Sequence, residues 1–159
     1  MVGPISKPSI RSLGVLLHPT ALPSDSVCGT FGNPSRNWLR LLALNGIGVW
    51  QFLPLSPPDP TGSPYSSPSS FALNPWFLDV QDLVDDGYIS SSVISKLPGS
   101  NKGQEPVLDF GLADSRSQKL GEYLRNEWEF QSLKRHKAFE VWSKKQPWLQ
   151  DHVFFYGVT

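Results

Sequence analysis

Gly14-Val15-Leu16-Leu17-His18-Pro19-Thr20 decides the fold, because it predicts a short buried strand that a proline stops. Proline has no N–H for strand pairing, and it holds the preceding His18 in an extended conformation. Val49–Leu55 is a second apolar run of the same kind. We therefore expect two buried strands that lie next to each other in a parallel sheet.

A helix is predicted between these two strands. Asn33-Pro34 supplies an N-cap residue followed by a proline at the first helical position, where the missing N–H costs nothing. Gly46 supplies the stop, so the helix covers roughly Pro34–Asn45. Strand, helix and strand in this order predict a right-handed crossover, with which a barrel or an open doubly wound α/β sheet begins.

The long loop that follows the second strand, Ser56–Pro75, is rich in proline and serine. We expect this loop to be ordered, because it carries aromatic residues and leads directly into an apolar run. A long loop at the C-terminal end of a parallel strand is more often functional than idle. Tyr65, held by Pro64, is interpreted either as a sugar platform with Ser63 and Ser66 as hydroxyl partners, or as a residue that pins the loop to the core.

The second half of the chain predicts short helices joined by loops. Asp79–Ile89 predicts a helical turn, and Ser90–Pro106 predicts a surface connection. Asp114-Ser115 is an N-cap signal for a helix that continues in pieces toward Gln146. Apolar side chains recur at every fourth position of that helix, namely Leu120, Leu124 and Trp128.

Composition argues against several classes of partner. The formal net charge is zero and the pI is near 6.8, so neither nucleic acid nor an anionic membrane surface is an expected partner. No apolar run approaches the length of a membrane span. Cys28 is the only cysteine, which excludes an intrachain disulfide and suits a reducing compartment. We therefore expect a cytoplasmic protein.

Most motifs for catalysis are missing from the sequence. The three histidines lack metal-ligand spacing, no G-x-S-x-G or glycine-rich phosphate loop occurs, and no pair stands out among the 14 Asp and Glu residues. Neither a metal nor a cofactor is expected. His18 is more typical of a hydrogen-bonded residue that fixes a strand end than of an acid–base catalyst.

The combination of motifs nevertheless resembles the N-terminal part of the 4-alpha-glucanotransferases, the amylomaltase or disproportionating enzyme family. The resemblance rests on GVLLHPT (14–20), Gly46, WQFLPL (50–55), GSPYSS (62–67) and FALNP (71–75). It implies an α/β fold in which this chain is a partial (β/α)8 TIM barrel, the first βαβ unit, with a helical inserted subdomain. A whole barrel needs about 250 residues, so a fragment is expected.

The resemblance also implies a function. Family members transfer a segment of an alpha-1,4-glucan to an acceptor such as glucose or a maltodextrin, which makes alpha-1,4-glucans and maltooligosaccharides the expected partners. Tyr65 is implied to stack on a sugar, Ser63 to line the same cleft, and His18 to lie on the catalytic face. The catalytic carboxylates are expected beyond Thr159, so no catalytic residue is assigned here.

Three segments and one alternative function complete these expectations. Residues 1–13 are expected to form an N-terminal extension, 14–89 the first strands and the loop on the active-site side, and 90–159 a truncated helical subdomain.

The alternative is a non-catalytic protein that binds glucan through Tyr65, Phe71 and Trp76. The P-x-x-P motif of Pro57–Pro60 could instead bind a partner as a polyproline helix.

Overall fold

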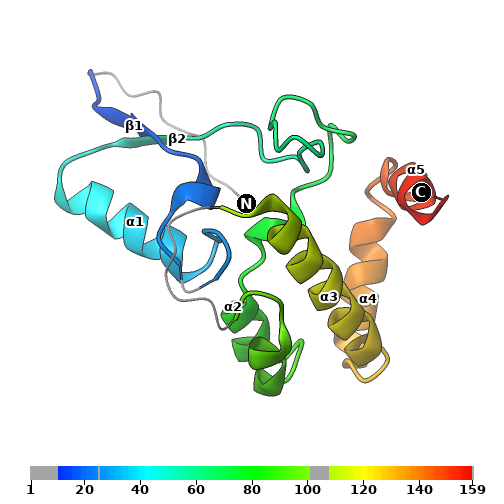
Figure 1. Cartoon of the computed structure of the whole chain (residues 1–159). Helices are drawn as coiled ribbons and strands as arrows, with labels where there is room; N and C mark the ends of the chain where they lie inside the picture. Colours follow the sequence, from blue (N-terminus) through cyan, green and yellow to red (C-terminus); the bar gives the residue numbers. More distant parts are fainter. Residues whose placement is uncertain (1–10, 25, 101–107, 159) are drawn as a thin grey trace.

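The computed structural model describes residues 11–24, 26–100 and 108–158 (Figure 1). β1 (Gly14–Leu16) and β2 (Val49–Gln51) form a parallel pair, with Val15 opposite Trp50. α1 (Asn33–Leu44) connects them and lies beside the sheet (Figure 1). The predicted strand, helix and strand are therefore confirmed, in a mixed α/β chain with a small parallel sheet.

The prediction that both strands are buried is wrong. Each strand alternates between exposed and half-buried positions; the side chain of Leu16 is 58% exposed and that of Val49 is 43% exposed. Burial of a parallel strand requires neighbouring strands and helices over both faces. The described residues supply one partner strand and one crossover helix, so part of the apolar surface of the sheet stays uncovered.

β2 is also shorter than the predicted Val49–Leu55. The amide of Leu17 donates the last ladder hydrogen bond, 3.0 Å, to the carbonyl of Gln51. The carbonyl of Leu17 then accepts from the indole Nε1 of Trp50 at 2.8 Å. Because a side chain takes this acceptor and Pro19 has no N–H, pairing cannot continue and the chain turns into the 3₁₀ helix η1 (Pro19–Ala21).

The C-terminal end of α1 follows the predicted signal, whereas the predicted N-cap Asn33 is wrong. The N-cap is Gly32 rather than Asn33, whose side-chain oxygen instead accepts from the guanidinium of Arg36 at 3.1 and 3.2 Å. Gly46 follows the C-cap with φ +69°, the left-handed conformation that glycine adopts without strain.

The main apolar core lies in the second half of the chain, between three short elements and one long helix. These are the 3₁₀ helix η2 (Pro75–Phe77), α2 (Val80–Asp85), the 3₁₀ helix η3 (Ser91–Lys96) and α3 (Phe110–Trp128). Val80 of α2, Val93 of η3 and Leu120 of α3 form one buried cluster with Ile89 and Leu97, which flank η3.

This core changes the interpretation of two predicted segments. Ser90–Pro106 is not only a surface connection, because Val93 and Leu97 are each 3% exposed; residues 101–107 lie outside the described ranges. The helix predicted from Asp114 begins earlier, since Asp109 is the N-cap and accepts from the amide of Leu112 at 2.9 Å. The Asp114 carboxylate instead accepts from the indole Nε1 of Trp76 at 2.9 Å.

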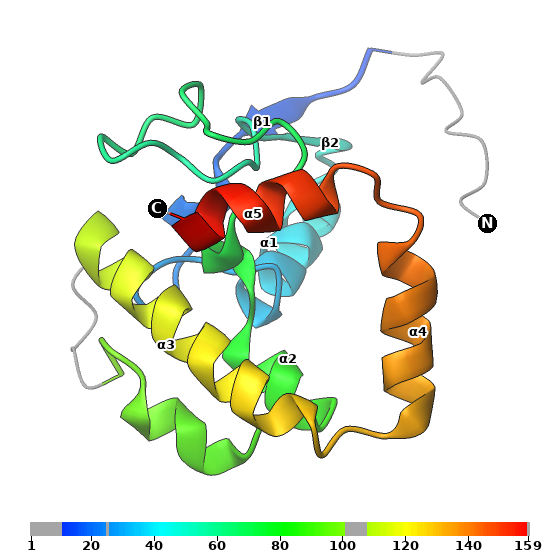
Figure 2. The same cartoon turned by 90° about the vertical axis from the view of Figure 1, so that its right-hand side faces the viewer.

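Two further helices complete the described chain. α4 (Leu133–Ser143) leads away from the end of α3, and α5 (Leu149–Val158) returns toward the loop that follows β2 (Figure 2). Trp128 of α3 meets Phe139 of α4 edge to face, with 5.3 Å between ring centroids. The ring of Trp148, just before α5, stacks on Phe71 of the loop at 6.0 Å.

Two leucines of α1 test this description of the sheet and its helix. Leu42 is 4% exposed and Leu44 is 86% exposed. We expect Leu42→Ala to lower the free energy of unfolding by about 2–5 kcal/mol, because it leaves a cavity. Leu44→Ala, the matched control, should change it by less than about 0.5 kcal/mol. Urea unfolding followed by circular dichroism measures both, and equal effects would contradict the described packing of α1.

Candidate functional site

His18 lies at the end of β1, where the chain leaves the sheet. Its Nδ1 shares a 2.8 Å hydrogen bond with Oγ1 of Thr20, and its ring lies 5.6 Å from that of Phe77. The other ring nitrogen, Nε2, is shielded from solvent and makes no hydrogen bond of ordinary geometry with the described residues, although the Pro54 carbonyl acts on the imidazole. A ligand reaches this nitrogen only if the residues around it shift.

A cavity of about 170 Å³ opens beside this imidazole. Its wall is mostly apolar, with a few polar groups from His18, Thr20, Ser56 and Asn74. The remaining lining residues are Leu53, Pro54, Pro58, Gly62, Pro64, Trp76, Leu108 and Phe110. An apolar wall with a few directed polar groups is typical of a small-molecule site. No Asp or Glu occurs among the described residues that line it.

The loop after β2 reaches this cavity through an ordered turn at Asp59–Gly62. The amide of Gly62 donates to the carbonyl of Asp59 at 2.8 Å. The Asp59 carboxylate accepts from the Thr61 hydroxyl at 2.6 Å and from the Ser63 amide at 3.1 Å. The hydroxyl of Thr61, helped by backbone amides, holds the pKa of the Asp59 carboxyl below its ordinary value. The predicted order of this loop is therefore built from local side-chain-to-backbone bonds.

Of the sequence-predicted site residues, His18 lines the cavity, whereas Ser63 and Tyr65 do not line it and are the chain neighbours of the lining residue Pro64. Ser63 precedes the lining residue Pro64, and its Oγ accepts from the amide of Tyr65 at 3.3 Å. Tyr65 is 74% exposed. The interpretation of Tyr65 as a residue that pins the loop to the core is thus contradicted, and its ring is open to a ligand.

Two alternatives from the sequence lose support. The indole of Trp76 is 8% exposed and stacks on Phe110 at 5.7 Å, so it offers no open face to a sugar. The P-x-x-P motif does not form an extended helix, because Pro60 lies inside the Asp59–Gly62 turn and Pro58 faces the cavity.

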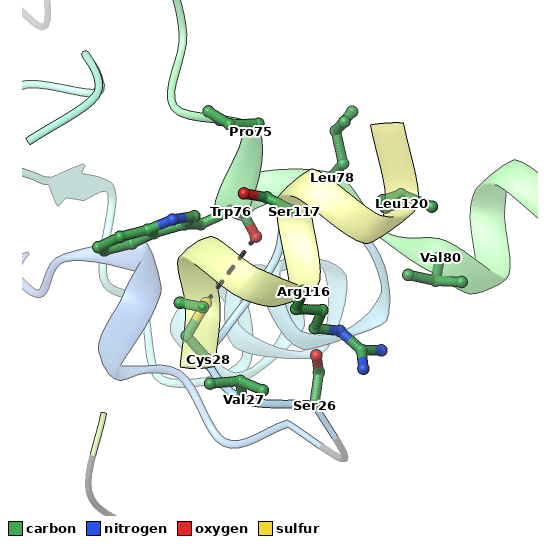
Figure 3. Close-up of a pocket in the computed structure, with 11 residues that line it drawn as sticks. Ser26, Val27, Cys28, Pro75, Trp76, Leu78, Val80, Arg116, Ser117 and Leu120 are labelled. Carbon is green, nitrogen blue, oxygen red and sulfur yellow. Dashed lines mark hydrogen bonds between the residues drawn. The ribbon is translucent and has the colours of Figure 1, made fainter. Parts of the chain in front are cut away.

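Trp76 also lines another, much smaller cavity of about 20 Å³ (Figure 3). Burial raises the pKa of the Cys28 thiol there to about 11, and its Sγ donates to the carbonyl of Trp76 at 3.8 Å. Arg116 is held by the carbonyl of Pro98 at 2.8 Å and the hydroxyl of Ser100 at 3.1 Å. A protonated thiol is a poor nucleophile, so we assign the residues around this cavity a packing role and no catalytic role.

Comparison with known proteins agrees with the motifs that surround the cavity. The family model described as 4-alpha-glucanotransferase matches residues 17–158, which include β2, the loop and the helices. The chain belongs to the 4-alpha-glucanotransferase family. The resemblance drawn from the sequence motifs is thereby confirmed.

Three relatives show how much of a 4-alpha-glucanotransferase this chain spans. The Thermus thermophilus enzyme is 35% identical over 147 residues, which are 91% of this chain and 28% of that protein. The Synechocystis enzyme is 29% identical over 150 residues, or 93% and 29%. The structure of amylomaltase from Streptococcus agalactiae in complex with acarbose matches with a TM-score of 0.82 and 27% identity, covering 94% of this chain and 30% of that one. The chain therefore spans less than a third of these relatives.

Other features of the described chain bear on its possible partners. Among the described residues there is no cluster of three or more His, Cys, Asp or Glu side chains that could hold a metal ion. None of the helices in the described ranges is both long enough and apolar enough to cross a membrane.

Sequence reasoning missed three residues that organise the cavity: Asp59, Asn74 and Phe110. Asp59 begins a Pro- and Gly-containing turn, a signal that was present in the sequence. Asn74 caps η2 by accepting from the amide of Trp76 at 3.0 Å, and Asn74-Pro75 repeats the signal recognised at Asn33-Pro34. Phe110 carried no local signal, because its role depends on a contact with a distant loop.

The burial of His18 gives a pH prediction. Desolvation lowers the pKa of its imidazole below 6.5, an effect that the Pro54 carbonyl partly offsets. Since the unfolded chain takes up the proton at higher pH than the folded chain, the free energy of unfolding should decrease as pH falls from 6.5 toward the folded-state pKa. Urea unfolding of the parent and of His18→Gln at several pH values isolates the contribution of His18 to this pH dependence. A parent-minus-variant difference that is constant with pH would contradict it.

Proposed function

We propose that this chain supplies substrate-side contacts of a 4-alpha-glucanotransferase, which transfers a segment of an alpha-1,4-glucan to an acceptor such as glucose or a maltodextrin. The observation that carries the proposal is the apolar cavity at the ends of β1 and β2, which is lined by His18 and by Pro64 of the loop. Tyr65, with an exposed ring, follows the cavity residue Pro64 directly. An aromatic face suits the apolar face of a pyranose, and an imidazole nitrogen suits its hydroxyl groups.

The division between binding and chemistry follows from the carboxylates. Glycosyl transfer with retention needs two carboxyl groups about 5 Å apart across the scissile bond. The described lining of the cavity carries no Asp or Glu, whereas it carries groups that can bind a sugar. We therefore assign substrate binding to His18, Ser63 and Tyr65, and we assign no catalytic residue to this chain. The nucleophile and the acid–base group would come from other parts of a whole enzyme.

The same proposal accounts for the uncovered sheet. β1, α1 and β2 would be the first unit of a (β/α)8 barrel, whose further strands and helices cover the exposed side chains of Leu16 and Val49. Residues 14–89 would then form the barrel part and 90–159 a helical inserted subdomain. The cavity lies where β1 and β2 end, which is the face on which barrel enzymes carry their sites.

Partners and location follow as further proposals. Acarbose in the Streptococcus agalactiae amylomaltase complex supports alpha-1,4-glucans and maltooligosaccharides as ligands of the cavity. A cytoplasmic location suits the single buried cysteine of this chain. The potato relative, 39% identical over 83 residues, is described as chloroplastic/amyloplastic, so a plastid is the second compartment to test.

A chimaera tests the proposed function. We expect the Thermus thermophilus enzyme, with its matching segment replaced by this chain, to convert maltotriose into glucose and longer maltodextrins, while the isolated chain produces neither. Tyr65→Ala in the chimaera should lower kcat/KM about tenfold, because the stacking surface is lost. Chromatography of the products measures both.

Phe130→Ala is the matched control, because Phe130 is 82% exposed and lies after the end of α3. It should leave kcat/KM of the chimaera unchanged. A chimaera that unfolds cooperatively but transfers nothing would contradict the proposed function. So would Tyr65→Ala and Phe130→Ala variants with the same kcat/KM.

A further inference from the structure

Gly62 and Phe110 come from distant parts of the sequence and lie in direct contact at the cavity. Gly62 has φ +80°, a backbone conformation that side chains other than glycine rarely adopt. A Cβ at this position would lie 2.9 Å from Cε1 of Phe110 and nearer still to Cε2 and Cζ. The aromatic ring therefore occupies the space that glycine leaves open, so the turn and the ring fit each other.

The Phe110 ring is itself fixed by the buried indole of Trp76. The two rings stack with 5.7 Å between centroids and 20° between planes. The edge of the same indole donates from Nε1 to Oδ1 of Asp114 at 2.9 Å. Phe110 and Asp114 are four residues apart on α3, so they lie on the same side of the helix. Phe110 stacks on the plane of the indole, and Asp114 accepts the hydrogen bond from its Nε1.

The turn needs such an anchor, because its other described bonds are local. The hydrogen bonds of Thr61, Gly62 and Ser63 all go to Asp59, only a few residues away. Local bonds fix the shape of a turn but not its position relative to the rest of the molecule. The contact between Gly62 and Phe110 ties the turn to α3, on the wall of the cavity that His18 also lines.

We propose that Phe110 is a positioning residue, which holds the Asp59–Gly62 turn and thereby sets the place of Tyr65 beside the glucan-binding cavity. The link to glucan rests on the proposed function, whereas the link to the turn does not. Phe110 is 39% exposed, so the ring covers the turn without filling a deep core. The first residue of α3, within the helical segment 90–159, would thus determine the geometry of a loop that belongs to the barrel segment.

Amide hydrogen exchange tests the structural part of this proposal. In Phe110→Ala, the amides of Gly62 and Ser63 should exchange about two- to tenfold faster, the range expected for loss of one aromatic contact. The amide of Leu17, which bonds to Gln51 in the sheet, reports on the rest of the fold and should be unchanged. Phe110→Trp should restore protection, and Phe130→Ala should have no effect. Unchanged exchange at Gly62 in Phe110→Ala would overturn the proposal.

A double-mutant cycle keeps the test valid if Phe110→Ala loosens the whole chain. Gly62→Ala should lower the midpoint of thermal unfolding more in the parent than in the Phe110→Ala background, because removal of the ring removes the clash and leaves only the strained φ. Equal shifts in the two backgrounds would overturn the contact on which the proposal depends.

Titration with maltoheptaose tests the functional part. The dissociation constant should rise about two- to tenfold in Phe110→Ala and return in Phe110→Trp, in step with the exchange of Gly62. Faster exchange with unchanged affinity would overturn the positioning role. If the unmodified chain binds no maltoheptaose, the proposed function fails. Hydrogen exchange and the double-mutant cycle then still decide whether Phe110 holds the turn.

Discussion

The arrangement of the site depends on the contacts that Trp76 makes. Its Nε1 donates to Asp114 of α3, its face stacks on Phe110, and the carbonyl of the same residue accepts from Cys28. These three contacts join the segment after β1, the end of the long loop and the first turns of α3. The indole is buried while Asp114 is an exposed residue of α3, so the hydrogen bond to its carboxylate is partly shielded from water. The same indole lines the cavity of about 170 Å³ that also has His18 and Pro64 in its wall.

Local signals in the sequence predicted the elements well, and long-range contacts account for what they missed. Gly46 and the Asn33-Pro34 pair bounded α1 to within a residue, since caps depend on a few neighbouring backbone groups. The burial of β1 and β2 could not be predicted, because it depends on which elements cover the sheet. The start of α3 was misplaced for a related reason. Asp114 looks like a cap in the sequence, but its carboxylate bonds to Trp76, a residue 38 positions earlier.

The candidate site likewise combines features that could be predicted from the sequence with features that depend on the fold. His18, Ser63 and Tyr65 were assigned to the site by the family resemblance, because the residues alone favoured a structural role for His18 and left two roles open for Tyr65. That they flank one cavity is a property of the fold. Phe110 had no such signal, since an aromatic residue at the start of a helix is common. The family match shows which family the chain belongs to, and the cavity lining, which carries no Asp or Glu, is the basis of our proposal that this part binds sugar and supplies no catalytic carboxylate.

The central claim is that a glucan contacts His18 and Tyr65 in the cavity at the ends of β1 and β2. Intermolecular nuclear Overhauser effects between maltoheptaose and the chain test it most directly, because they report which protein protons lie close to a sugar. The account predicts effects from the sugar ring protons to the Tyr65 ring and to the imidazole of His18. Effects confined to other exposed aromatic residues, such as Phe130 and Phe154, would contradict it.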